Sequence, residues 1–203
     1  MNNLNKIALE PEIKNALYPF WVFKNQLDKT TCNKIIDLGK KKWVEAKIHN
    51  RKDYREVLVD TSKRISDIFF TNEQWLYDIA WKYLLLANQN SNWNFQIDSC
   101  EAMQITRYKK NGHYDFHFDG NGFTRSQVEN KFIKNKTRKL SMTIVLNDNY
   151  EGGEFEFFNN KSLIKEKTGT IIVFPSYIVH KVKPVTKGTR YSLVVWFCGE
   201  PFK

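Results

Sequence analysis

The chain has 203 residues, of which 41% are hydrophobic, and this length and composition suit one domain with a packed core. The 32 Lys and Arg residues outnumber the 22 Asp and Glu residues, so the formal net charge is +10, an excess that suits nucleic acid, an anionic surface or an acidic substrate without choosing among them. The longest apolar runs, Leu84–Ala87 and Ile171–Phe174, are far shorter than the roughly 20 residues of a membrane-spanning helix, and the 15% aromatic content argues against disorder.

The first part of the chain, residues 1–94, carries the helical signals and is expected to form a helical support region. Asp28–Thr31 offers N-cap candidates for a helix that stops at Gly39. A second helix is expected over Thr71–Asn88, where apolar side chains recur at roughly helical spacing. Two short strands are expected between these helices, at Val57–Val59 and Ile68–Phe70.

The second part, residues 95–203, is expected to form the core, because runs rich in β-branched and aromatic residues alternate with turn residues. The expected strands include Ala102–Tyr108, Leu140–Leu146, Gly153–Phe158, Thr170–Phe174, Val179–Val182 and Arg190–Phe197. Several are apolar on both faces, as in a sheet whose outer face is covered by helices. The predicted fold class is mainly β with flanking α, a β-sandwich or jelly roll supported by N-terminal helices.

Two of the four histidines lie close together near the middle of the chain. On an extended strand, His117 and Asp119 present an imidazole and a carboxylate on the same face. This pair suits a divalent metal such as Fe(II), if a third ligand joins it and open coordination positions remain. His180 is the best third ligand, because it lies on a predicted strand and the interval after Asp119 is long enough for several strands to return.

The other histidines are weaker candidates. His113 and Asp115 also share one face of the same strand, and spacing alone does not choose between the two pairs. The position of Asp119 nearer the predicted strand end, where an open site can form, favours His117 and Asp119. His49 lies in a polar stretch and is expected at the surface.

Arg190 begins a strongly apolar strand ten residues after His180, across an expected hairpin near Lys187–Gly188. With a period of two, Arg190, Ser192 and Trp196 share a face of this strand. If that face is interior, Arg190 is a buried cation that needs an anionic partner, and a carboxylate-bearing ligand beside the metal would supply one bidentately. The alternative, an edge arginine that points into water, has equal weight at this point.

Together these motifs resemble the Fe(II)/2-oxoglutarate-dependent dioxygenases, and among them the prolyl 4-hydroxylase type. The likeness covers about residues 95–198, extends weakly to Leu27–Leu38 and Arg64–Ser66, and selects His117/Asp119 over His113/Asp115. The matching residues, in chain order, are Gln104–Tyr108, Gly112, Tyr114, His117–Asp119, Leu146–Asp148, Gly152–Phe155, Phe174–Pro175, His180 and Arg190–Trp196.

The resemblance implies a double-stranded β-helix, which is a jelly roll, in which His117, Asp119 and His180 hold Fe(II). It implies that Arg190 pairs with the distal carboxylate of the co-substrate 2-oxoglutarate and that the Tyr108 hydroxyl assists. Dioxygen is the other co-substrate, and ascorbate is a frequent reductant in the family. The implied catalytic residues are thus the three metal ligands and Arg190.

The reaction that the resemblance implies is hydroxylation of an unactivated C–H bond, with succinate and CO2 as co-products. The expected substrate is a peptidyl proline or another amino-acid side chain in a protein or peptide. Tyr114 and Ser192 are further helpers on weaker grounds.

Other functions stay open. The positive net charge is compatible with the same chemistry on a nucleic-acid base. Base-demethylating members of the superfamily, however, carry two arginines around an Asn-x-Thr-Phe segment after the distal histidine, whereas only Arg190 is found here. A small-molecule substrate is another alternative. A non-catalytic basic β-sandwich binding protein would tolerate changes at His117 or Asp119. A nucleic-acid-binding module is not supported by any recognisable RNA-binding or helix-turn-helix signature.

Half of the charge excess lies in residues 121–139, which hold six basic residues and one acidic residue. Since this segment follows Asp119 directly, one hypothesis is a mobile lid that faces an acidic substrate. The alternative is a solvated surface insertion.

Cysteine usage and the start of the chain bear on the cellular compartment. Cys32, Cys100 and Cys198 are an odd number without metal-binding spacing, which is typical of a reducing environment. The polar residues at the start show no secretory signal. The sequence therefore predicts a cytoplasmic protein that does not associate with membranes.

Overall fold

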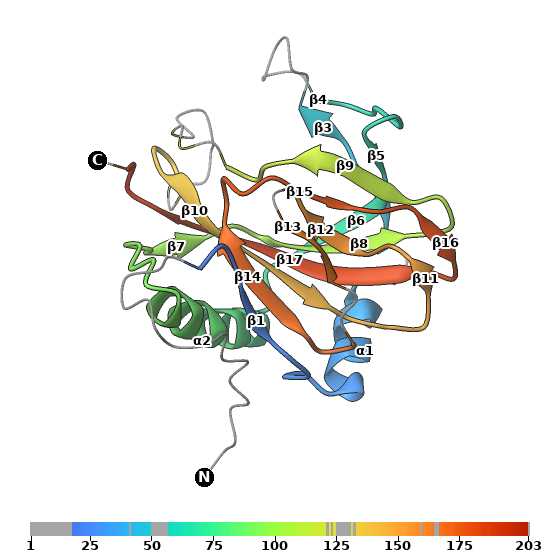
Figure 1. The fold of residues 1–203 in the computed structure, drawn as a ribbon, viewed down its shortest axis with the longest axis horizontal. Coiled ribbons are helices and arrows are strands. Elements are labelled where there is room, and N and C mark those ends of the chain that lie inside the picture. The colour runs from blue at the N-terminus through green and yellow to red at the C-terminus, as the bar shows by residue number, and fades with distance from the viewer. Residues whose placement is uncertain are drawn as a thin grey trace.

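The computed structural model describes residues 18–40, 42–49, 57–120, 122, 124, 131, 133–158, 160–164 and 167–202. Two antiparallel sheets face each other, and two helices lie on the opposite side of the larger sheet, as Figure 1 shows. This is the mainly β fold with flanking helices that the sequence predicts.

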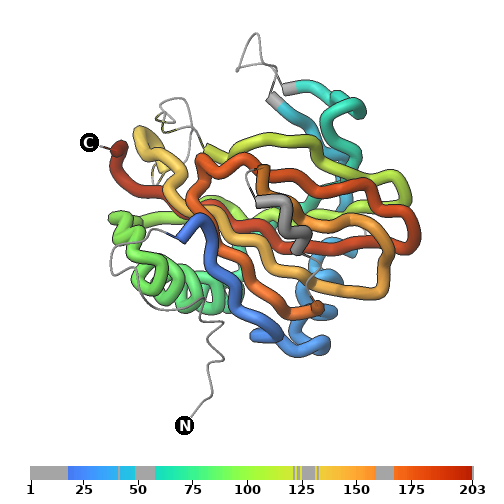
Figure 2. Tube along the Cα trace, viewed as in Figure 1, coloured from blue at the N-terminus to red at the C-terminus, as the bar shows by residue number. Residues whose placement is uncertain are grey.

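The larger sheet has eight strands. Its order is β1 (Trp21–Phe23), β14 (Ile171–Pro175), β10 (Thr137–Val145), β17 (Arg190–Gly199), β8 (Met103–Tyr108), β6 (Asp67–Thr71) and β2 (Val44–Glu45), and β7 (Ser99–Cys100) pairs with β17. Figure 2 shows the blue β1 beside the orange β14, the contact by which an early strand extends this sheet.

The smaller sheet has five strands in the order β13 (Asn160–Ile164), β12 (Phe155–Phe157), β15 (His180–Val182), β9 (His113–His117) and β5 (Arg64–Ile65). Two short antiparallel pairs complete the described strands: β11 (Glu151–Gly152) with β16 (Val185–Lys187), and β3 (Ile48–His49) with β4 (Val57–Leu58).

Helix α1 (Lys29–Leu38) begins and ends where the sequence predicts. The Asp28 carboxylate accepts a hydrogen bond from the Thr31 backbone N–H at 2.6 Å, and Gly39 is the C-cap. Cys32 and Ile35 form its buried face, so the helix is anchored to the sheet by apolar contacts as well as by its cap.

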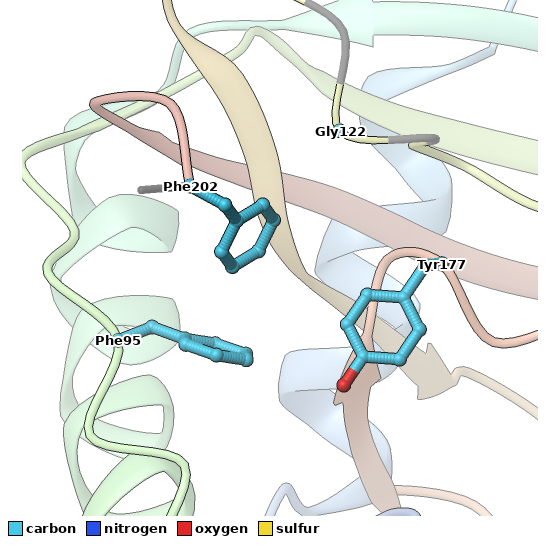
Figure 3. A pocket seen from close by; sticks show the side chains of 4 residues that line it. All are labelled: Phe95, Gly122, Tyr177 and Phe202. Atoms are coloured by element: carbon cyan, nitrogen blue, oxygen red, sulfur yellow. The ribbon is translucent and has the colours of Figure 1, made fainter.

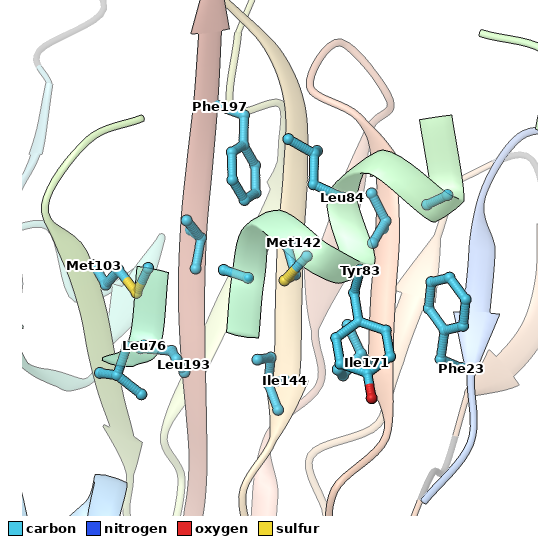
Figure 4. Packing of buried hydrophobic residues seen from close by; sticks show 14 of the residues in the cluster. Phe23, Leu76, Tyr83, Leu84, Met103, Met142, Ile144, Ile171, Leu193 and Phe197 are labelled. Atoms are coloured by element: carbon cyan, nitrogen blue, oxygen red, sulfur yellow. The ribbon is translucent and has the colours of Figure 1, made fainter. Parts of the chain in front are cut away.

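Helix α2 (Gln74–Asn90) begins three residues later than expected, because Thr71 is the last residue of β6. Its buried residues recur at helical spacing and pack on the outer face of the larger sheet, as Figure 4 shows for Leu76, Tyr83 and Leu84. Burial of this size contributes roughly 1.5–3 kcal/mol per large side chain.

A second apolar cluster fills the space between the two sheets. It contains Phe155, Phe157 and Val182 from the smaller sheet and Tyr108 and Phe174 from the larger one, with Ile172 and Val185. The strands of the larger sheet are therefore buried on both faces, which explains their continuous apolar runs.

The expected strands are confirmed in place, with bounds shifted by a few residues. Several described strands have no counterpart in the sequence prediction, among them the three-residue edge strand β1, and β13, which begins at Asn160 where a turn was expected. The expected hairpin between His180 and Arg190 is wrong. Strand β15 lies in the smaller sheet and β17 in the larger one, so the intervening chain crosses between sheets.

The division into a support region (1–94) and a core (95–203) stays a prediction. Within the described residues, β1, β5 and β6 from the first region pair with β14, β9 and β8 from the second. Both sheets therefore contain strands from before residue 95.

The basic segment 121–139 is only partly described, since residues 121, 123, 125–130 and 132 lie outside the described part of the structure. The expectation of a lid is wrong for residues 137–139, because they belong to β10. The Lys136 ammonium is 2.7 Å from the Asp98 carboxylate, and Lys139 is only 6% exposed.

Neither helix of the described structure is both long and apolar enough to cross a bilayer. All three cysteines are described, and all three are free thiols.

Candidate metal centre

The structure brings His117, Asp119 and His180 together. One ligand atom from each lies within 4.8 Å of the others, and the Nε2 atoms of both histidines lie 3.7 Å from the Asp119 carboxylate oxygens. The convergence follows from the sheet register, because β9 and β15 pair with His117 opposite His180. All three side chains are largely buried: the exposed fractions are 17% for His117, 7% for Asp119 and 5% for His180.

The two imidazole rings are oriented by backbone carbonyls. The Nδ1 atom of His117 lies 2.8 Å from the Asp115 oxygen, and Nδ1 of His180 lies 2.8 Å from the Ile178 oxygen. Since a carbonyl only accepts, each Nδ1 carries the proton, and the Nε2 lone pair of each ring faces Asp119. This is the arrangement by which outer hydrogen bonds commonly fix metal-binding histidines.

The protonation states suit metal binding. Burial, followed by the neighbouring charge of His180, lowers the pKa of His117 to about 3, so its imidazole is neutral near pH 7. Burial alone would raise the pKa of Asp119, but its electrostatic interactions with His180, His117 and Arg138 and a hydrogen bond from Ser141 lower it on balance. The Asp119 carboxyl is therefore an anion near neutral pH.

The donor set fits an Fe(II) ion. The Asp119 Oδ2 atom is buried, and in the described structure it has no hydrogen-bond partner, which is costly for a carboxylate unless a cation is bound. Two imidazole nitrogens and one carboxylate are the ligands of facial non-haem iron sites, which leave coordination positions open for reactants.

The second candidate pair does not join this cluster. The Asp115 carboxylate instead lies 3.0 Å from the Lys63 ammonium, and the His113 ring contacts the Asn111 carbonyl at 3.0 Å. The side chain of His49 lies outside the described part of the structure.

Arg190 is a buried cation, with an exposed fraction of 2%, so the alternative of an edge arginine in water is wrong. Its Nη1 atom donates to the Ser192 hydroxyl at 3.1 Å, and its guanidinium lies 5.4 Å from the centre of the Tyr108 ring. Its Nε has no hydrogen-bond partner, and within the described residues no carboxylate lies within 4 Å of it. A buried arginine without an anion is expensive and calls for an anionic ligand.

Tyr114 lies directly against the metal ligands. Its ring stacks on His117 with 3.5 Å between ring centres and 12° between planes, and the Arg64 guanidinium covers its other side at 4.5 Å. Burial raises the pKa of the Tyr114 hydroxyl, which therefore stays a neutral donor. Its contact with a co-substrate or substrate stays a prediction.

Two charged residues at the site have no counterpart in the sequence prediction. Arg138 forms a two-pronged ion pair with Glu101 and also donates to the Asp119 carbonyl. Glu101 and Arg138 are 37 positions apart, and their partnership follows no helix or strand period, so the sequence gives no signal for it.

An open aromatic pocket adjoins the loop that carries Asp119. It has a volume of about 480 Å³ and is lined by Phe95, Gly122, Tyr177 and Phe202. Figure 3 shows the three aromatic rings around a common space, with Gly122 nearby. Tyr177 follows Ser176, whose carbonyl accepts a hydrogen bond from the Asp119 N–H at 2.9 Å.

The fold and the three converging side chains define a jelly-roll protein with a candidate metal site of two histidines and one carboxylate. Residues 103–198 match the family model described as the 2OG-Fe(II) oxygenase superfamily, so this segment is similar to that superfamily. A protein of Acanthamoeba polyphaga mimivirus, provisionally named a prolyl 4-hydroxylase, is 25% identical over 195 residues, which is 91% of this chain and 75% of that protein. The chain spans less than half the length of the PKHD-type hydroxylases that also match it.

Two solved structures share the fold. A viral collagen prolyl hydroxylase of Paramecium Bursaria Chlorella virus-1, in its 2OG complex, has a TM-score of 0.68 and 20% identity, covering 90% of this chain and 97% of that one. A Trichoplax adhaerens prolyl hydroxylase, in complex with a peptide fragment of the hypoxia inducible factor oxygen degradation domain, has a TM-score of 0.66 and 17% identity, covering 88% and 83%. The fold class predicted from the sequence, a double-stranded β-helix, is confirmed.

Proposed function

We propose that this chain is an Fe(II)- and 2-oxoglutarate-dependent dioxygenase that hydroxylates a peptidyl proline or another amino-acid side chain. One observation carries the proposal: a three-residue cluster and a buried arginine share the interior of one sandwich, and among the described residues one carboxylate oxygen of the cluster has no hydrogen-bond partner and the arginine has no anionic partner. A metal ion would satisfy the first, and a dicarboxylate the second.

In this proposal His117, Asp119 and His180 hold Fe(II), and Arg190 binds the distal carboxylate of 2-oxoglutarate through its fork of N–H donors. Tyr108 lies opposite Arg190 in the register of β8 and β17, so its hydroxyl is placed to assist. When bound, the iron and its co-substrate supply the activation of dioxygen, with succinate and CO2 as co-products.

The protein's own part is to bind, to orient and to exclude water. Phe155 stacks near His180 with 5.2 Å between ring centres, and the Phe174 ring lies 4.7 Å from the same histidine. These apolar walls keep solvent from the reacting atoms and strengthen the charge interactions of Arg190 inside the sandwich.

A protein or peptide substrate is supported by the relatives, two of which carry the name prolyl hydroxylase in peptide or collagen contexts. The net charge of +10 favours acidic sequences around the modified residue, because opposite charge steers and retains a partner. Ascorbate is proposed as the reductant that keeps the iron ferrous.

The test is succinate release from 2-oxoglutarate by the iron-loaded protein with candidate substrates. Proline-containing peptides with acidic flanks should stimulate succinate release, and mass spectrometry should find a gain of one oxygen atom in the peptide. Oligonucleotides of matched charge form the comparison. Stimulation by oligonucleotides alone would reject the peptide substrate and favour a nucleic-acid base.

A further inference from the structure

We infer that Arg138 is a positioning residue for the metal ligand Asp119, and that Glu101 and Trp196 hold Arg138 in place for this purpose. The inference rests on the proposed metal centre. The need for such a device follows from the fold, because β9 ends at His117 and Asp119 lies beyond it. The pairing of β9 with β15 therefore fixes His117 but leaves the Asp119 backbone to be fixed by other contacts.

Both backbone polar groups of Asp119 have partners. The Asp119 N–H donates to the Ser176 carbonyl at 2.9 Å, and the Asp119 carbonyl accepts from Nη1 of Arg138 at 3.0 Å. The first contact comes from the turn after β14 and the second from β10. Together they fix the peptide planes on both sides of the Asp119 Cα atom, which sets the direction of the carboxylate.

Arg138 is itself held rigidly. Its Nε and Nη2 atoms donate to the two Glu101 carboxylate oxygens at 2.6 and 2.7 Å, and its guanidinium lies 4.0 Å from the centre of the Trp196 ring. The side chains of Arg138 and Glu101 are 15% and 12% exposed, so the pair is shielded from water. A forked ion pair with a ring across its face leaves the guanidinium little freedom.

Glu101 has a second consequence for the metal. An unneutralised guanidinium beside Asp119 would repel a divalent cation, and the Glu101 carboxylate offsets that charge. Arg138 can then donate a strong hydrogen bond to the Asp119 carbonyl without weakening metal binding. Outer contacts of this kind commonly change metal affinity by about 10- to 100-fold when they are removed.

The loop after Asp119 packs on Arg138. A side-chain carbon built at Gly120 would lie 2.9 Å from Cβ of Arg138, closer than real side chains come, and 3.1 Å from its carbonyl oxygen, which is a tight contact. The backbone at Gly120 therefore packs directly on β10 at Arg138, which brings the ligand loop within reach of the guanidinium.

The chain contains a matched control. Arg107 makes the same kind of unit, with Nε and Nη2 at 3.0 and 2.8 Å from the Asp67 carboxylate and its guanidinium 4.6 Å from the centre of the Trp43 ring. Its side chain is 21% exposed, close to the value for Arg138. Within the described structure its hydrogen bonds reach none of the three metal ligands.

The experiment measures the affinity of the metal-free protein for Mn(II), by electron paramagnetic resonance of the free ion, in the wild type and in Arg138→Met, Arg138→Lys and Arg107→Met. We expect Arg138→Met to weaken Mn(II) binding by tenfold or more and Arg107→Met to leave it within about twofold. Arg138→Lys should also weaken binding, because an ammonium keeps the charge but cannot make the three directed contacts.

A second readout reports the geometry of the bound metal. The visible absorption bands of the Co(II)-loaded protein should change in Arg138→Met and stay unchanged in Arg107→Met. This difference should hold even if the melting temperature falls by a similar amount in both variants. Wild-type affinity in Arg138→Met, or in Arg138→Lys, would overturn the inference. If Arg138→Met does not fold, Glu101→Gln replaces it, with weaker Mn(II) binding expected and unchanged binding counting against the inference.

Failure of the proposed function gives a different result. If the wild type binds no Mn(II), the metal centre itself is wrong. If the wild type binds Mn(II), His180→Ala does not, and the Arg138 variants bind as the wild type does, the centre stands and only the role of Arg138 is rejected.

Discussion

At the scale of single residues, the clearest feature is that the interior holds charges whose partners are not all protein groups. Within the described part of the chain, one Asp119 carboxylate oxygen and the Arg190 Nε–H have no hydrogen-bond partner, and both atoms are buried. Natural proteins rarely leave such groups unpaired, since each costs about 1–3 kcal/mol, and more when the group is charged. These two unpaired charged atoms are therefore the observations that support the proposed metal ion and dicarboxylate.

Replacing Arg190 should have opposite effects on 2-oxoglutarate affinity and on the stability of the ligand-free protein. The Arg190→Met variant should bind 2-oxoglutarate roughly 30-fold or more weakly, measured by calorimetry with Mn(II) in the site, because the loss of a buried charged partner costs about 2–5 kcal/mol. Without 2-oxoglutarate, the same variant should be as stable as the wild type or more so, because an uncompensated buried cation has been removed.

Mn(II) affinity is the control in this experiment, and it should not change, since Arg190 is not a ligand. Wild-type affinity for 2-oxoglutarate in Arg190→Met would show that this arginine does not bind the co-substrate.

At the scale of elements, the turn before β14 joins three parts of the chain. The Gly169 carbonyl accepts hydrogen bonds from the Gln26 and Leu27 N–H groups, and its own N–H donates to the Val145 carbonyl at 2.7 Å. Gly169 has φ of +82°, and a side-chain carbon there would overlap the Leu27 carbonyl oxygen. This turn therefore fixes where the segment before α1 meets the larger sheet.

The Gly169→Ala variant should lower the free energy of unfolding by about 2–4 kcal/mol in urea titrations, because backbone strain and the overlap with Leu27 act together. Gly122→Ala is the matched control. Gly122 has φ of +83°, but the nearest atom to an added carbon is 3.9 Å away, so only the conformational cost, about 1 kcal/mol, is expected. Equal losses in the two variants would rule out the overlap.

Helix α1 gives a prediction about pH through Cys32, which is 1% exposed. Burial, together with the charge of Asp28, raises the pKa of this thiol from 9.0 to about 11. The folded state keeps the proton at a pH where the unfolded chain has lost it. The contribution of Cys32 to stability is therefore complete below pH 9 and is lost as the pH rises toward 11.

Two measurements check this prediction. Iodoacetamide should modify Cys32 at pH 8 at least 100-fold more slowly in the folded protein than in urea, followed by mass spectrometry of the peptide. In Cys32→Ala the fall in unfolding free energy between pH 9 and 11 should be smaller. Rapid modification in the folded protein would mean that α1 does not cover the thiol.

The elements also show how far the sequence alone can reach. Helix α1 was predictable because its cap residues are local signals, and the β runs were predictable because burial on both faces leaves a continuous apolar pattern. Strand β13 was not, since Asn160 has the composition of a turn and its strand identity comes from pairing with β12. The hairpin between His180 and Arg190 was wrong because an interval of ten residues does not reveal which sheet each strand joins.

The site divides in the same way. His117, Asp119 and His180 could be proposed because histidines are few and their spacing on strands has a physical meaning. Glu101 and Arg138 could not, because Glu101 follows β7 and Arg138 lies on β10, two strands that each pair with β17, and no sequence period marks this meeting. The resemblance to dioxygenases supplied the choice between the two His-x-Asp pairs, which the residues alone left open.

At the scale of the whole molecule, the site exists because two sheets face each other. The proposed metal ligands His117 and His180 come from β9 and β15 of the smaller sheet, whereas Arg190 and Tyr108 come from β17 and β8 of the larger one. Helices α1 and α2 pack on the far face of the larger sheet, so they stabilise it without occupying the space between the sheets.

The central claim is that one metal ion and one 2-oxoglutarate bind together in this space. Its most direct test is the visible spectrum of the protein under anaerobic conditions, after addition of Fe(II) and then 2-oxoglutarate. We predict a metal-to-ligand charge-transfer absorption band in the green region of the visible spectrum, which should be absent in His180→Ala. A featureless spectrum from well-folded wild-type protein would contradict the claim.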